Sequence, residues 1–93
     1  MQYSVKDRFL RYVQVDTEAD PYSNTSPSSA KQKNLTALIL QELSEMGIPA
    51  TTNESGYIYA SLPSNAGPGK DKIFFCAHLD TAPDCSGKDV KPI

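Results

Sequence analysis

The stretch IFFCAHLD, residues 73–80, decides how this chain is expected to fold. Its first five residues are apolar on both alternating faces, which is typical of an interior strand covered from both sides. Such a strand needs neighbours, so the stretch predicts a sheet with helices packed on its faces. His78 and Asp80 would then lie where the strand leaves the sheet.

His78 and Asp80 carry the chemistry that this stretch offers. Side chains alternate along a strand, so Cys76, His78 and Asp80 share one side if the extended conformation persists to position 80. In open α/β sheets, functional groups gather at the carboxyl ends of the strands. Imidazole is a preferred zinc ligand, and a metal-bound His usually gives its other N–H to a carboxylate. The spacing leaves two interpretations open: Asp80 orients His78, or both residues bind a metal directly.

Local chemistry alone does not establish a metal site here. A single His after an apolar strand is often a core or surface residue without a ligand, and a His-x-Asp triplet is frequent by chance. Cys76 lies inside the apolar run, so it is interpreted as a packed core cysteine rather than an accessible nucleophile. A structural zinc site of Cys76, His78 and Cys85 has acceptable ligand types but lacks the paired Cys-x2-Cys spacing of convincing sites.

The N-terminal residues predict a short helix followed by a loop. Ser4 can cap this helix, with Asp7 at the third helical position, and we expect the helix to end near Val13. The polar stretch of residues 16–28 is rich in turn formers and is interpreted as a loop. The apolar face of the helix would be formed by Val5, Phe9, Tyr12 and Val13.

A second, longer helix is predicted after this loop. Ser29 and Gln32 form a capping-box pattern at its start, and Gly47 is suited to the left-handed conformation that ends a helix. An apolar stripe along this helix is expected from Leu35, Leu38, Ile39, Leu43 and Met46.

Short β-rich runs follow the second helix. Residues 50–53 and 57–62 flank Glu54-Ser55-Gly56 and predict a hairpin, and the Gly- and Pro-rich residues 63–70 predict a surface loop. The expected order is helix, helix, hairpin and buried strand, an α/β arrangement with too few layers to cover the last element. We therefore expect the α/β layer to continue beyond residue 93, and the chain alone to be poorly stable.

Composition excludes several classes of function. A net charge of −2 offers no excess of cations for phosphates, so nucleic-acid binding is not expected. No apolar run reaches the roughly 18 residues that span a bilayer, and the N-terminus lacks an apolar signal core, so we expect no membrane partner and a cytoplasmic location. In that compartment Cys76 and Cys85 are expected to be reduced thiols.

The segment from Phe74 to Lys88 resembles the first metal-site motif of tripeptide aminopeptidases in the M20 family of zinc metallopeptidases. His78-Leu79-Asp80 alone is a weak signal, but Thr81 and the run Pro83-Asp84-Cys85-Ser86-Gly87 make the likeness fairly specific. Looser likeness extends over nearly the whole chain, in residues 8–13, Asp16-Thr17, Pro27-Ser28, Glu45-Met46-Gly47 and residues 60–65.

The resemblance implies a mixed-sheet zinc-exopeptidase-like fold, of which residues 1–93 would be the N-terminal portion of the catalytic domain. His78 would match a zinc ligand, and Asp80 the catalytic-site aspartate that orients this His. Two zinc ions would activate water in the complete enzyme, with a glutamate as general base. The implied partners are a short peptide substrate, a tripeptide, and a second copy bound through a smaller inserted domain.

The family's other metal ligands, its general base and its inserted domain would all follow residue 93. The chain then holds at most one zinc ligand, whereas stable sites use roughly three or four, so we predict that the 93-residue chain is inactive. Two alternatives remain: a non-catalytic binding module or inactive homologue, and a small structural zinc domain that uses Cys76, His78 and Cys85.

Overall fold

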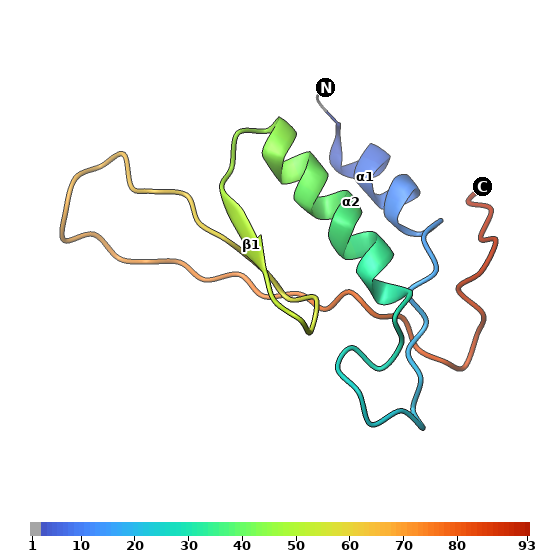
Figure 1. Cartoon of the computed structure of the whole chain (residues 1–93). Coiled ribbons are helices and arrows are strands. Elements are labelled where there is room, and N and C mark those ends of the chain that lie inside the picture. The colour runs from blue at the N-terminus through green and yellow to red at the C-terminus, as the bar shows by residue number, and fades with distance from the viewer. Residues whose placement is uncertain (1–2) are drawn as a thin grey trace.

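A computed structural model describes residues 3–93 of the chain. Its elements are α1 (Val5–Tyr12), α2 (Gln32–Glu45), β1 (Ala50–Thr52) and β2 (Ile58–Ala60), so the chain is α/β (Figure 1). In Figure 1, α2 lies between α1 and the hairpin, and a long loop projects from the hairpin before the chain returns past it.

Helix α1 begins at the Ser4 cap that the sequence predicts, and the cap is a reciprocal capping box with Asp7. The hydroxyl of Ser4 accepts a hydrogen bond from the Asp7 backbone N–H at 3.1 Å, and Asp7 Oδ2 accepts one from the Ser4 backbone N–H at 2.9 Å. Hydrogen bonds from the Ser4 side chain and backbone lower the pKa of Asp7. The predicted apolar face is only partly covered, however: Val5 is 85% exposed and Phe9 62%, whereas Tyr12 and Val13 are half-buried.

Helix α2 starts later than its predicted capping box. Lys31 is the N-cap and makes no capping hydrogen bond through its side chain. The hydroxyl of Ser29 donates instead to the backbone carbonyl of Glu18 at 2.7 Å, a contact eleven residues away. The prediction of a cap at Ser29 and Gln32 was therefore wrong, because a long-range partner orients the Ser29 hydroxyl.

The end of α2 is set by Gly47, as predicted. Gly47 has a φ of 73°, and its N–H donates to the carbonyl of Ser44 at 3.0 Å. The N–H of Ile48 donates to the carbonyl of Leu43 at 2.9 Å. These two bonds make a Schellman motif, which satisfies carbonyls that the helix itself leaves without partners.

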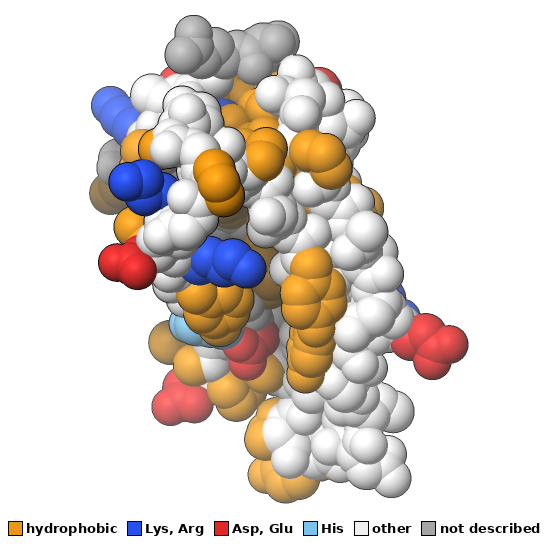
Figure 2. Space-filling model, turned by 90° about the vertical axis from the view of Figure 1, so that its left-hand side faces the viewer, with side chains coloured by type: hydrophobic (Ala, Val, Ile, Leu, Met, Phe, Trp, Pro, Cys, Tyr) orange, Lys and Arg blue, Asp and Glu red, His pale blue; other side chains and the backbone are white. Residues whose placement is uncertain are grey.

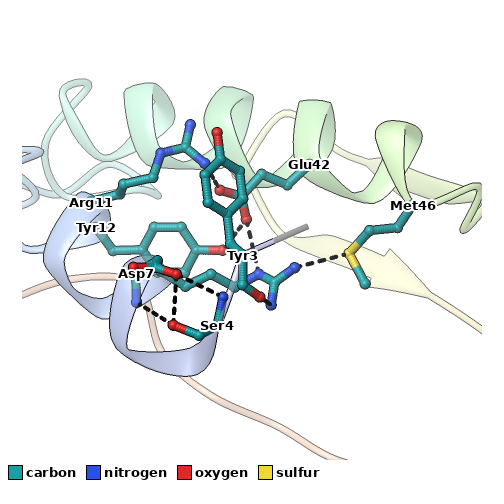
Figure 3. Close-up of polar contacts among 8 residues, drawn as sticks. Tyr3, Ser4, Asp7, Arg11, Tyr12, Glu42 and Met46 are labelled. Carbon is teal, nitrogen blue, oxygen red and sulfur yellow. Dashed lines mark hydrogen bonds and ion pairs between the residues drawn. The ribbon is translucent and has the colours of Figure 1, made fainter. Parts of the chain in front are cut away.

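A buried carboxylate connects α1 to α2. The side chain of Glu42 is 5% exposed and accepts hydrogen bonds from Arg11 and from the Tyr12 hydroxyl (Figure 3). Arg8 Nε lies 3.4 Å from Glu42 Oε2. We call Arg8, Arg11, Tyr12 and Glu42 the interhelix cluster. Burial, the hydrogen bond to Glu42 and the charge of Glu42 raise the pKa of Tyr12 to about 12.

The predicted hairpin is present, with shorter strands than expected. β1 and β2 are antiparallel, with Ala50 opposite Ala60 and Thr52 opposite Ile58. Gly56 in the connecting loop has a φ of 78°, and its carbonyl accepts a hydrogen bond at 3.0 Å from the hydroxyl of Thr36 in α2. This bond fixes the hairpin loop to the helix. Leu35 lies beside Thr36 and is 6% exposed, the one buried hydrophobic residue among residues 3–93.

Residues 73–77 do not form the buried strand that the sequence predicts. The segment is open chain, and Ile73, Phe74 and Phe75 are 81%, 86% and 87% exposed. Cys76 is exposed too, so its interpretation as a packed core residue was wrong. The described residues hold one sheet of two strands, and no strand of it pairs with this segment. We call residues 71–80 the return segment. Figure 2 shows that several apolar side chains are exposed on the face of the molecule in view.

No helix among residues 3–93 combines the length and the apolar character that crossing a membrane requires.

Candidate functional site

His78 and Asp80 contact each other at the end of the return segment. His78 Nδ1 lies 2.9 Å from Asp80 Oδ1. Because a carboxylate can only accept, Nδ1 carries the proton in this contact and the Nε2 of a neutral imidazole keeps its lone pair. The His78 side chain is 83% exposed, so Nε2 is open to a ligand.

This arrangement matches one of the two interpretations left open by the spacing. Asp80 Oδ1 is occupied by the imidazole, as in a carboxylate that fixes the tautomer of a metal-binding His. The roles of His78 as metal ligand and Asp80 as orienting residue stay predictions.

The two cysteines do not complete a metal site with His78. Cys76 and Cys85 are free thiols, and both are exposed. Within residues 3–93, no three His, Cys, Asp or Glu side chains come together in a group that could hold a metal ion. The Cys76, His78 and Cys85 arrangement of a structural zinc domain is therefore not assembled in this chain.

The backbone next to Asp80 is held by the chain that follows α1. Thr81 N–H donates to the carbonyl of Thr17 at 3.1 Å, and Ala19 N–H donates to the carbonyl of Thr81 at 2.9 Å. These bonds form a short parallel bridge, and Thr17 is 2% exposed. The sequence predicted only a loop at residues 16–28, because nothing local in a polar stretch indicates a partner more than sixty residues away.

Charged side chains surround this bridge. Lys31 Nζ donates to Asp16 Oδ2 at 3.1 Å and lies 3.6 Å from Glu18 Oε2. Asp16 Oδ1 accepts a hydrogen bond from the Glu18 backbone N–H at 3.1 Å. That backbone bond first, and then Lys31, lowers the pKa of Asp16, whereas the hydrogen bond to Asp16 raises the pKa of Lys31. We call Asp16, Glu18 and Lys31 the Lys31 cluster.

A surface concavity borders the Lys31 cluster, and Glu18 and Lys31 line it. It is lined by residues 18–22, by Ser29 and Lys31 near the start of α2, and by Pro83 and Asp84. His78 and Asp80 are not among its lining residues. The concavity therefore lies near the candidate site but does not contain it.

Comparisons with known proteins agree with the resemblance inferred from the motif. No protein-family model matches the chain. The chain is 48% identical over 88 residues to Peptidase T of Desulfitobacterium hafniense, a match that covers 95% of this chain and 22% of that protein. It is 44% identical over 93 residues to Peptidase T of Geobacillus thermodenitrificans, over 99% of this chain and 23% of that protein.

Peptidase T of Staphylococcus aureus is 41% identical over 92 residues, which is 99% of this chain and 22% of that protein. The similarity to proteins of this name thus extends over nearly the whole chain. The chain itself spans less than a quarter of the length of these curated relatives.

Proposed function

We propose that this chain is the N-terminal part of a zinc-dependent aminopeptidase that releases the first residue of tripeptides. The observation that carries the proposal is the similarity to proteins named Peptidase T, at 41% to 48% identity, across a chain that includes His78 and Asp80. The contact of 2.9 Å between these two side chains supports the roles assigned below.

The donor atoms present suit one corner of a zinc site. Zinc binds imidazole nitrogen, and in this tautomer the exposed Nε2 of His78 offers a lone pair. Zinc sites use roughly three or four protein ligands, and the described residues bring no three candidate ligands together. The remaining ligands are therefore expected from residues outside this chain.

Each of the two residues has a separate task in the proposed reaction. When bound, zinc polarises a carbonyl and lowers the pKa of a bound water, which provides a nucleophile at neutral pH. His78 would hold the metal through Nε2. Asp80 accepts a hydrogen bond from the Nδ1–H, which favours one ring orientation and one tautomer and would raise the basicity of Nε2 toward the metal.

Two substitutions in the complete protein test these tasks. His78→Ala removes a ligand, so zinc content and tripeptide hydrolysis should fall together. Asp80→Asn keeps the size of the side chain but replaces the carboxylate. It should lower activity by about 10- to 100-fold, as is typical for the loss of an orienting partner. Zinc content should fall less than activity. Zinc is measured by atomic spectroscopy and hydrolysis by release of the N-terminal amino acid.

The outcomes separate the proposal from its alternative. Wild-type activity in either variant would end the assignment of these residues. A complete wild-type protein that folds but neither binds zinc nor cleaves tripeptides would instead be a non-catalytic homologue. The 93-residue chain, assayed in parallel, is expected to show no hydrolysis because it supplies a single ligand.

A further inference from the structure

Thr81 is the one residue of the chain after β2 whose backbone is hydrogen-bonded to the N-terminal half, within the part that the structure describes. The bonds lie at 3.1 Å to the Thr17 carbonyl and at 2.9 Å from the Ala19 N–H. Thr81 directly follows Asp80, so whatever holds residues 17–19 also holds the end of the His78 to Asp80 segment. Figure 1 shows these two parts of the chain crossing near the start of α2.

Residues 16–19 are in turn fixed to the start of α2 by side chains. Lys31, the N-cap residue, donates to Asp16 and lies 3.6 Å from the carboxylate of Glu18. Ser29 donates to the Glu18 carbonyl at 2.7 Å. A connected path therefore runs from helix α2 through the Lys31 cluster and the Thr81 bridge to Asp80 and His78.

Packing around Asp16 leaves little freedom for this path to shift. A Cβ atom placed on Gly87 would lie 3.0 Å from Asp16 Oδ1 and 3.3 Å from the Thr81 hydroxyl oxygen. The backbone at residue 87 thus lies close beside the Asp16 carboxylate and the Thr81 hydroxyl, with little room for a side chain. Ion pairs as exposed as these contribute roughly 0–1 kcal/mol to stability, so stability is a weak reason for two carboxylates to converge on one ammonium group.

We infer that the Lys31 cluster positions the candidate metal site, with Lys31, Asp16 and Glu18 holding Asp80 and His78 in place through the Thr81 bridge. The expected effect of the cluster on catalysis rests on the proposed function. The holding of the Thr81 bridge by the cluster rests on the contacts described above. Lys31, Asp16 and Glu18 are positioning residues, since the hydrogen bonds and ion pairs of residues 3–93 include none from them to His78 or Asp80. Precise sites depend on such support, because displacements of about 1 Å can cost about 100-fold in rate.

Amide hydrogen exchange in the zinc-free complete protein tests the structural part. Lys31→Ala should speed exchange at the Thr81 and Ala19 amides by about threefold to fivefold, because both are donors in the bridge. Amides inside α2, such as that of Leu43, should keep their protection. Lys33→Ala, which removes an exposed lysine from the same end of the helix, should change Thr81 exchange by less than about twofold.

Kinetics of the zinc-loaded protein test the catalytic part. Lys31→Ala should lower kcat for tripeptide hydrolysis about tenfold with KM nearly unchanged, since misplacement affects the reacting groups rather than peptide binding. Lys31→Arg keeps the charge and should restore most of kcat. Gly87→Ala, which pushes on Asp16 without changing any charge, should lower kcat in the same way.

Three outcomes would overturn the inference. Unchanged exchange at Thr81 in Lys31→Ala would show that the cluster does not hold the bridge. Loss of protection that spreads through α2 would show general destabilisation instead of positioning. Faster exchange with unchanged kcat would remove the connection to the site. A wild type without peptidase activity would refute the proposed function, while exchange at Thr81 would still decide whether the cluster holds this segment.

Discussion

Two regions of the molecule, the elements from α1 to β2 and the return segment, differ in how their side chains are buried. Their compositions do not suggest this difference. The first part has polar links between its elements: Glu42 joins α1 to α2, and Thr36 joins α2 to the hairpin. The return segment has the most apolar run of the chain, yet Phe74 and Phe75 are almost fully exposed. Apolar character alone therefore does not bury a strand, because burial needs a partner surface, whereas a few well-placed polar pairs can connect short elements.

The largest expected effect concerns Phe75. In the complete protein, the proposal implies an interior strand, so Phe75→Ala should cost about 3–4 kcal/mol of unfolding free energy. In the 93-residue chain, where Phe75 is 87% exposed, the cost should stay within about 0.5 kcal/mol. Denaturant unfolding of both forms measures the difference. Equal effects in the two would mean that the return segment does not gain a partner surface.

A smaller effect is expected from substitution of Glu42, which tests whether polar side chains hold α1 and α2 together. Glu42→Ala leaves Arg8 and Arg11 without their shared carboxylate, and should cost about 2 kcal/mol, below the usual range for buried pairs because both arginines are partly exposed. Glu45→Ala on the exposed side of the same helix is the control and should stay within about 0.5 kcal/mol. Similar losses in the two variants would contradict a special role for the interhelix cluster.

Gly47 should matter less than Glu42. Its φ of 73° is unfavourable for a residue with a Cβ, so Gly47→Ala should cost about 1 kcal/mol. Space is not the reason, because an added Cβ would meet no atom within 4 Å. Gly47→Asn should lose less, since Asn tolerates the left-handed region. Thermal unfolding midpoints compare the two variants, and an Ala variant as stable as wild type would argue against the observed helix end.

The smallest expected effect is the response of Tyr12 to alkaline pH. Its pKa is raised from 10.0 to about 12, so the folded state holds the phenolic proton more tightly than the unfolded state does. The resulting contribution of Tyr12 to the free energy of unfolding is present below pH 10 and is lost as the pH rises from 10 to about 12. Because Tyr12 is only half-buried, we expect a change below about 1 kcal/mol. Tyr12→Phe should remove it, and an unaltered pH profile in this variant would show that another group is responsible.

Local interactions explain what could be predicted from the sequence. The cap at Ser4 with Asp7, the helix end at Gly47 and the hairpin loop with Gly56 all depend on residues within a few positions of one another. The contact between His78 and Asp80 is also local, since the two residues are two positions apart in the sequence. The motif around them was sufficient to identify the resemblance that the comparisons support.

Long-range partners explain what could not be predicted. The Ser29 hydroxyl is taken by Glu18, and Glu42 is buried because Arg8 and Arg11 reach it from another helix. Neither partner leaves a periodic signal in the sequence. The strand predicted at residues 73–77 does not form for the same reason. Its apolar pattern is typical of a strand with neighbours, and the sheet of the described residues offers it none. The Thr81 bridge, which supports the candidate site, joins parts of the chain that no local pattern connects.

The exposed return segment has a practical consequence for handling the 93-residue chain. An extended, apolar run without proline, such as Ile73–Ala77, has the character of segments that pair between molecules and aggregate. Asp71 and Lys72 before it and Asp80 after it are charges of the kind that flank such runs and oppose stacking. We therefore expect the light scattering of the isolated chain to rise with concentration and with salt, as screening weakens this protection.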